Sequence, residues 1–404
     1  MTINGTFRFH AVGQGLFYSG LIQGTGYRYG ETFSFVYDCG SISSRCFLHR
    51  EIDDFKALLP YAHSRSKKRL DLLIVSHLHD DHVNGLEHLL DNVEVDTVVM
   101  PYTDPVIRLL ARAESSSEEE FLSAFYIDPI GWFASNGAHR ILLIGSPPDG
   151  DYRNQESNDY ISRYNGEADC IHVERSCILA SDSVGETELL FLDNIAQAEI
   201  SLYWRFRFSN LKLSVTKNYI DTVDRFQREK MLSLDDIFHD RLMTKELAKR
   251  LRSVIPSEKT INRTSVVVEH APRLEQGKIT CFQSPLPIWI GSSMHSKYLK
   301  DILYPLRKIF DHCRRTVLTG DIEIKEDESI PLSDKLEYTV FQYPHHGARK
   351  ALPYTTSLHR AVVVFSAGVV NKYGHPHPDV LNNEEYSILV TERNAFDYSI
   401  AVIE

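Results

Sequence analysis

Histidine and aspartate crowd into HLHDDH at residues 77–82, directly after the apolar run LDLLIVS. His77 and His79 are two positions apart, so in an extended segment their side chains point the same way and can bind one ion together. Asp81 and His82 stand where a helical pattern begins, and from there they can reach a second ion. Imidazole and carboxylate suit zinc, with manganese or iron as alternatives. The stretch therefore predicts half of a metal site.

Side chains of the same types follow buried strands in the last third of the chain. TVLTGD ends in Asp321, although a TGD tripeptide alone is more often a plain turn. FQYPHHG contains His345 and His346, which fit a metal ligand beside a proton donor. NKYGHPHP supplies His375 and His377. Any of these histidines could instead lie at the surface or be satisfied in the core, and we favour that reading for His377.

These motifs together resemble a known hydrolase family. HLHDDH matches the HxHxDH signature of the metallo-β-lactamase fold, which also assigns the ligand role to Asp81 rather than Asp80. With HAVGQG, FVYDCGS, LTGD, PHHG and NKYGHPHP, the set is similar to the ComEC-type branch of DNA-uptake proteins and related soluble hydrolases. The resemblance covers roughly 1–100 and 262–385. It implies an α/β fold, a four-layered αββα metallo-β-lactamase sandwich with a large mid-chain insertion.

The resemblance also implies the rest of a dinuclear site. Asp321 would bridge two divalent ions, with zinc favoured and manganese as the alternative. His346 and His375 would complete the second ion, and which of the two lies closer stays open. The predicted metal ligands are His77, His79, Asp81, His82, Asp321, His346 and His375.

The catalytic roles follow from two bound cations. A water between them loses its proton near neutral pH and becomes the nucleophile, while the cations neutralise charge on the phosphoryl oxygens. Asp81 or Asp321 can orient the water, and His345 can protonate the leaving oxygen. Asp38 and Gln14 are candidates for supporting the ligands, and both are equally explicable as turn and strand-end residues.

Two departures from the branch stand out. PHHG continues with Ala348 where the branch usually has serine, so we expect one hydroxyl contact to substrate phosphate to be missing. Many relatives also carry another metal-binding histidine between the first motif and the aspartate, and no histidine of that interval sits in a convincing motif here. We therefore expect the first ion to have fewer protein ligands and more water. The histidines of the interval are His139, His172, His239, His270 and His295.

The spacing of apolar residues divides the chain into three parts. Residues 1–102 read as strands and helices of an N-terminal half-domain, and 261–404 as the C-terminal half. Between them, 103–260 reads as an insertion or subdomain, mixed and partly helical. Within it, 145–169 is loop-like and 232–255 is typical of two amphipathic helices. The apolar run AVVVFSAGVV at 361–370 predicts a buried strand.

Composition limits the partners. The 404 residues include 44 Lys and Arg against 55 Asp and Glu, a net charge of −11. This balance argues against binding long nucleic acid by bulk electrostatics, and is compatible with short or single strands held by a few local cations. The six cysteines form no CxxC pair, which predicts reduced thiols in a cytoplasmic protein. No run is long enough to cross a membrane.

The sequence thus predicts a metal-dependent hydrolase, with a phosphodiester of nucleic acid or of a nucleotide derivative as its substrate. One alternative is hydrolysis of a small carboxylic ester, thioester or lactone, for which the insertion should form a closed apolar pocket. Another is a non-catalytic metal-binding regulatory module, which the near-complete ligand set disfavours. The oligomeric state is not predicted.

Overall fold

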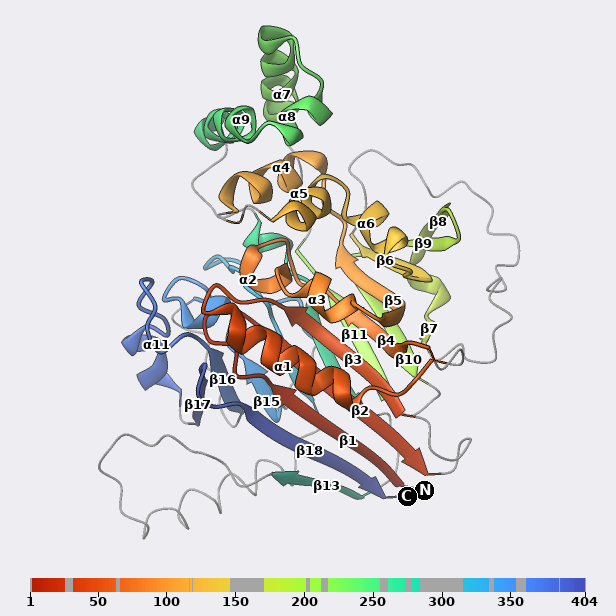
Figure 1. Cartoon of the computed structure of the whole chain (residues 1–404). Helices are drawn as coiled ribbons and strands as arrows, with labels where there is room; N and C mark the ends of the chain where they lie inside the picture. The colour runs from red at the N-terminus through yellow and green to blue at the C-terminus, as the bar shows by residue number, and fades with distance from the viewer. Residues whose placement is uncertain are drawn as a thin grey trace.

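Two β-sheets packed face to face, with helices outside them, build the protein (Figure 1). The computed structural model describes residues 2–25, 32–62, 66–115, 117, 119–145, 171–200, 204–211, 217–254, 261–272, 278–283, 315–333, 338–353, 361–384 and 386–403. The predicted loop at 145–169 lies outside the described residues, apart from its first position.

The first sheet contains both ends of the described chain. Its neighbours pair antiparallel up to β3 and in parallel from β3 to β9, with β8 antiparallel at the edge. In spatial order its ten described strands are β13 (Lys278–Gln283), β18 (Phe396–Ile403), β1 (Thr2–Phe9), β2 (Phe17–Thr25), β3 (Thr32–Cys39), β4 (Lys68–Ile74), β5 (Val93–Pro101), β6 (Arg140–Ile144), β9 (Thr187–Leu192) and β8 (Ile178–Val184).

The second sheet is built mainly from the later part of the chain. Strands β14 to β17 pair in parallel, and the remaining neighbours are antiparallel. In spatial order its eight described strands are β17 (Ser387–Val390), β16 (Val362–Ser366), β15 (Val340–Gln342), β14 (Thr316–Leu318), β12 (Val267–Pro272), β11 (Trp204–Ser209), β10 (Ile195–Ile200) and β7 (Ile171–Val173).

Three apolar cores hold the layers together. Because side chains alternate across a strand, Leu73 of β4 packs under the helices, while Leu72 and Ile74 pack between the sheets. Helices α1 (Arg45–Leu58) and α3 (Leu86–Leu90) cover the first sheet, and α11 (Pro378–Asn383) packs outside the second. The predicted α/β architecture of two sheets between helices is confirmed.

A group of helices from the middle of the chain stands at one edge of the sheets (Figure 1). Its apolar faces share the core under the first sheet, so it is packed onto the sandwich. The two helices predicted within 232–255 are confirmed as the last two of this group. The helices are α4 (Pro105–Glu114), α5 (Glu120–Ile127), α6 (Pro129–Ser135), α7 (Lys217–Lys230), α8 (Leu234–His239) and α9 (Arg241–Val254).

The segment predicted as an insertion also contributes strands to both sheets. Strands β6, β8 and β9 belong to the first sheet, and β7, β10 and β11 to the second. The sheets are therefore continuous across the expected boundaries, and the division at 102 and 260 stays a prediction. None of the described helices is long and apolar enough to cross a membrane.

One predicted strand is shorter than expected. Of the apolar run 361–370, β16 takes only Val362–Ser366. The chain then leaves the sheet, and the side chain of Val370 is 91% exposed. Hydrophobicity alone could not reveal this end, because the residues after Ser366 are as apolar as those before it.

Two glycines, Gly15 and Gly40, allow the loops at the sheet edge to lie close to one another and to the Asp81–His82 backbone. Gly15 has φ +150°, and a Cβ there would lie 2.3 Å from the carbonyl oxygen of Gly40 and 2.8 Å from that of Asp81. A Cβ on Gly40 would lie 2.5 Å from the peptide joining Asp81 to His82. The backbone N–H of Leu16 donates to the Asp81 carbonyl at 3.1 Å. The HAVGQG and YDCG motifs therefore support the backbone of the histidine-rich segment.

Gly15→Ala should lower the free energy of unfolding by at least about 2 kcal/mol more than Gly137→Ala does, because strain and a backbone clash add. Gly137 is the matched control: it also has positive φ, +84°, but a Cβ there meets nothing within 4 Å. Urea denaturation of both variants measures the difference. Equal losses would show that the close approach at Gly15 is not needed.

Candidate metal centre

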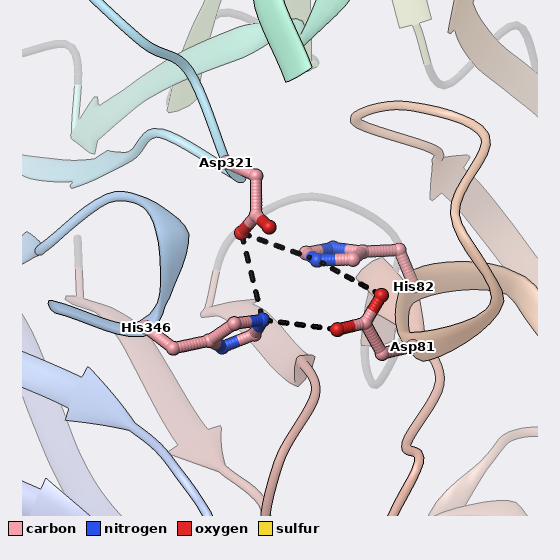
Figure 2. Close-up of side chains that lie close together, drawn as sticks. All are labelled: Asp81, His82, Asp321 and His346. Carbon is pink, nitrogen blue, oxygen red and sulfur yellow. Dashed lines mark hydrogen bonds and ion pairs between the residues drawn. The ribbon is translucent and has the colours of Figure 1, made fainter. Parts of the chain in front are cut away.

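Four side chains from three separate segments meet at the edge of the sheets (Figure 2). Asp81 and His82 lie on the short helix α2 (Asp80–Val83), Asp321 follows β14, and His346 lies in the turn after β15. One nitrogen or carboxylate oxygen from each lies within 4.8 Å of all the others. His346 Nε2 is 3.2 Å from Asp81 Oδ2, and His82 Nε2 is 3.2 Å from Asp321 Oδ1. Residues some 240 to 265 positions apart thus form one cluster.

The backbone around this cluster adopts unusual conformations. Among the described residues, five other than glycine have positive φ, and three of them are Asp38, His345 and His346. Such conformations cost about 1–3 kcal/mol each and persist where surrounding structure fixes them. Gly320 before Asp321 also has positive φ, +56°, and a Cβ there would lie 2.7 Å from the Ser76 side chain. The turns that bring the cluster together are therefore tightly constrained.

A second group of nitrogens lies beside the first. His77 Nε2 and His79 Nδ1 face each other at 3.0 Å, as the two-residue spacing predicts. The His77 and His82 rings lie 4.2 Å apart between centroids, so the pair adjoins the four-residue cluster. Burial, together with the neighbouring His82 and His79, holds the pKa of His77 well below its usual range. His77 is therefore a neutral imidazole, the form that binds metal.

Five histidines at or beside the cluster use their two ring nitrogens differently. One nitrogen faces the cluster or a neighbouring histidine, and the other contacts a residue behind the ring. Such a contact fixes the ring's orientation and tautomer, as outer partners do for metal-ligating histidines. The pairs are His77 Nδ1 with Ser76 Oγ at 2.9 Å, His79 Nε2 with Glu114 Oε2 at 3.1 Å, His82 Nδ1 with Asp38 Oδ2 at 2.7 Å, His345 Nδ1 with Glu323 Oε1 at 3.0 Å, and His346 Nδ1 with the Ser366 carbonyl at 2.7 Å.

The charges of the cluster are matched to one another. Burial alone would lower the pKa of His82, but the carboxylates of Asp321 and Asp38 raise it well above its ordinary value. Burial likewise opposes ionisation of Asp321, yet the imidazoles of His346 and His82 hold its pKa well below the usual range. Burial also lowers the pKa of His346, but the carboxylates of Asp321 and Asp81 outweigh this effect and raise it above its ordinary value.

Two buried atoms of the cluster lack hydrogen bonds. His82 Nε2 and Asp321 Oδ1 have no hydrogen-bond partner among the described residues, although they face each other. Buried polar atoms are normally satisfied. Imidazole nitrogens and carboxylate oxygens converging on one point form a donor set that fits a divalent cation such as zinc or manganese. The residues present therefore fit a metal site.

The other predicted site residues take different places. Asp38 lies behind His82 and also accepts hydrogen bonds from Ser76 N and Oγ, both at 2.6 Å. His375 lies outside the four-residue cluster, with its ring centroid 5.4 Å from that of His345 and 6.3 Å from that of His346. Gln14 is buried, and its Oε1 accepts from Gly368 N at 3.4 Å. It thus supports the chain after β16 rather than a ligand.

Histidines without a motif are explained by their surroundings. His270 lies between the sheets, where Tyr18 OH at 2.9 Å and Trp204 Nε1 at 3.3 Å bond its two nitrogens, and burial lowers its pKa to about 3. His377 caps α11 through Asp379 N. His139 lies 3.6 Å from Asp96, and the side chain of His239 is largely exposed. His172 is exposed on β7, and His295 lies outside the described residues.

Three supporting residues carry no strong sequence signal. Ser76 directly precedes the histidine motif, and Glu323 lies two positions after Asp321, so their proximity to the ligands could have indicated them. Glu114 lies 35 positions from His79, at the end of α4, and only the tertiary fold brings them together. Its other oxygen accepts from Arg252 of α9 at 2.9 Å. The mid-chain helices therefore reach the histidine motif.

Comparison with known proteins agrees with this geometry. Residues 19–151 match the sequence model of the Metallo-beta-lactamase superfamily. A search of curated proteins found no significant match. The matched part runs from β2 past β6 and includes the HxHxDH motif. With the two sheets and their helices, it supports the predicted metallo-β-lactamase sandwich. The superfamily implies a metal-dependent hydrolase, and the cluster is a possible His/Asp metal site.

The stability of the metal-free protein should fall as the pH rises from 7 to 8.5. The folded-state pKa values of His82 and His346 lie above 6.5. In this range the folded protein therefore keeps protons that the unfolded chain has released, and stability is lost as pH rises through the folded pKa values.

Urea midpoints in EDTA at several pH values measure this slope. Asp38→Asn removes one of the two carboxylates that raise the pKa of His82, so the slope should become shallower. A midpoint that rises with pH in the parent protein would contradict the charge pairing described for the cluster.

Proposed function

We propose that the protein hydrolyses phosphodiesters of single-stranded nucleic acid or of nucleotide derivatives with two divalent ions at this centre. The observation that carries the proposal is the convergence of Asp81, His82, Asp321 and His346 beside the paired His77 and His79. Six potential ligands in two adjoining groups, each histidine oriented from outside, disfavour a module that merely retains a degenerate site.

The two positions differ in their protein ligands. His77, His79 and Asp321 would hold the first ion. Asp81, His82, His346 and Asp321 would hold the second. No described histidine completes the first position, which leaves room there for water or substrate. Bound divalent ions supply Lewis acidity that lowers the pKa of water and withdraws charge from a phosphoryl group.

His345 is the residue we assign to the leaving group. Its Nε2 lies 3.8 Å from Asp321 Oδ2, at the border of the cluster rather than inside it. Its Nδ1 is held by Glu323 at 3.0 Å, which orients the ring. A positioned imidazole can donate a proton to the departing oxygen. Asp81, whose side chain is 16% exposed, can accept a hydrogen bond from the attacking water.

Local positive charge supports an anionic substrate. Lys350 and Arg349 follow the His345–Gly347 turn, and Lys372 lies three residues before His375; all three are exposed. Arg349 is paired with Asp379 at 3.5 Å, whereas Lys350 and Lys372 stand close in sequence to the histidines of the centre, in a chain whose net charge is −11. Cations at the site matter more than distant charges, because salt screens over about 8 Å at physiological ionic strength. A neutral ester or lactone would not need them, and it remains the alternative substrate.

Metal content and turnover test the proposal together. The purified protein should bind one to two zinc or manganese ions per chain. His79→Ala and Asp81→Ala should reduce hydrolysis of bis-p-nitrophenyl phosphate by at least about 10³-fold while circular dichroism stays unchanged. His239→Ala changes an exposed histidine of α8 and should keep full turnover. A folded, metal-free protein, or unchanged turnover in either ligand variant, would overturn the proposal.

Glu114→Gln should weaken the first metal position by about 10- to 100-fold, the usual effect of losing an outer partner. The amide keeps the size of Glu114 but loses the charge that favours an Nε2–H on His79. Chelator competition with cobalt measures both affinities, and only the weaker-ligated position should change. Glu229→Gln is the control, because it removes another carboxylate–arginine contact in the same helical group, to Arg250. Equal effects of the two variants would show that Glu114 acts only through stability.

A further inference from the structure

The loop between β16 and α11 begins at the metal centre. Ser366, the last residue of β16, accepts a hydrogen bond from His346 Nδ1 at 2.7 Å. The next residues carry apolar and aromatic side chains into solvent: Val370 is 91% exposed and Tyr373 50%. The exposed ring of Tyr373 is therefore accessible to a ligand.

The side chain of Asn371 holds this loop in one conformation. Its Nδ2 donates to the carbonyls of Gly368 at 2.8 Å and His375 at 2.7 Å. Its Oδ1 accepts from the backbone N–H of His375 at 3.0 Å and of Tyr373 at 3.2 Å. The loop backbone is thus held by the polar contacts of Asn371. The half-exposed side chain of Tyr373 is not part of the buried core. A pre-ordered aromatic side chain loses little entropy when it binds a ligand.

Neighbouring aromatic rings connect Tyr373, through His375, to the histidines of the metal centre. Tyr373 and His375 lie 5.8 Å apart between centroids at an interplanar angle of 28°. His375 in turn lies 5.4 Å from His345 and 6.3 Å from His346. Lys372 Nζ lies 5.3 Å from the Tyr373 ring centroid. A flat aromatic surface and a cation therefore stand together one ring away from the proposed proton donor.

We propose that Tyr373 and Lys372 form a nucleobase subsite, in which Tyr373 stacks on a base next to the scissile phosphodiester and Lys372 contacts a neighbouring phosphate. The inference rests on the proposed function and names how its substrate is held. Aromatic stacking with local cations is the usual way to bind single strands without reading their sequence. It also lets a chain of net charge −11 bind an anionic strand, since stacking does not depend on overall charge.

Tyr61 and Lys68 provide a matched pair for comparison. Tyr61 is 63% exposed, and Lys68 Nζ lies 4.1 Å from its ring centroid. The pair lies at the start of β4, whereas the histidine motif follows the end of that strand. At about 3.3 Å per residue, seven residues separate the two places by roughly 20 Å. Tyr61→Ala therefore removes a tyrosine that is somewhat more exposed than Tyr373 and also lies beside a lysine, but away from the centre.

Binding of a labelled oligothymidylate with phosphorothioate linkages to the metal-loaded, full-length protein tests the subsite. Tyr373→Ala should weaken binding about tenfold, within the range for loss of one stacked base, whereas Tyr373→Phe and Tyr61→Ala should stay within twofold. Lys372→Ala should lower the slope of log affinity against log salt by about 0.7, the share of one phosphate contact on a single strand.

An abasic oligomer of the same length separates stacking from other effects. It offers phosphates but no bases, so the parent protein and Tyr373→Ala should bind it equally. The inference is overturned if Tyr373→Ala binds oligothymidylate as the parent does, if Tyr373→Phe loses as much as alanine, or if the abasic oligomer shows the same loss.

Turnover distinguishes this inference from the proposed function. If oligonucleotides are hydrolysed, Tyr373→Ala should raise KM for them about tenfold more than for the abasic oligomer, which offers phosphodiesters but no base. If the parent protein binds oligothymidylate through Tyr373 but hydrolyses no phosphodiester, the proposed function fails and the subsite stands. If the parent protein does not bind oligothymidylate, the subsite is rejected whatever its activity.

Discussion

Carboxylates removed from water at the edge of the two sheets set the main constraint on this structure. Asp38 and Asp321 are almost completely buried, and Asp81 is nearly so. A buried charge is costly unless it is paired and hydrogen-bonded, and removing its partner is strongly destabilising. His82 lies between Asp38 and Asp321, and His346 between Asp81 and Asp321. Segments distant in sequence must therefore meet with little positional freedom, which accounts for the left-handed residues and close glycine contacts around them.

The mid-chain helices are coupled to this centre through two adjacent residues. His79 contacts Glu114, which Arg252 of α9 holds from the other side. Asp80 accepts hydrogen bonds from Ser115 Oγ at 3.1 Å and Tyr126 OH at 2.7 Å, so it connects the motif to α4 and α5 and lies outside the four-residue cluster. The position that the HxHxDH signature leaves undefined therefore has a structural role. A shift of these helices would be transmitted to His79 directly.

Local sequence could predict those parts of the site that belong to a motif or to a regular spacing of residues. The spacing of His77 and His79 indicated their common direction, and the apolar run before them indicated β4. The strand predicted from the run 361–370 was too long, because β16 ends at Ser366. Hydrophobicity does not mark the end of a strand when the residues that follow it are also apolar. Glu114 could not be found because its contact with His79 depends on the packing of α4 and α9. The expected helix after the motif is broken at Asn84 and Gly85 into α2 and α3, where Gly85 N bonds the Cys39 carbonyl.

Charge balance connects the metal-free state of the centre to the metal-bound state. Without metal, protons on His82 and His346 offset the carboxylates, which is why both pKa values are raised. Metal binding requires neutral imidazoles, so these protons must leave as ions enter. The carboxylates of Asp38, Asp81 and Asp321 would then balance three of the four charges of two divalent ions, and a hydroxide formed from the attacking water would balance the fourth. The charge of the centre therefore does not by itself select a phosphodiester over a neutral ester. Stacking on Tyr373 would supply a preference for nucleotides that this charge balance lacks.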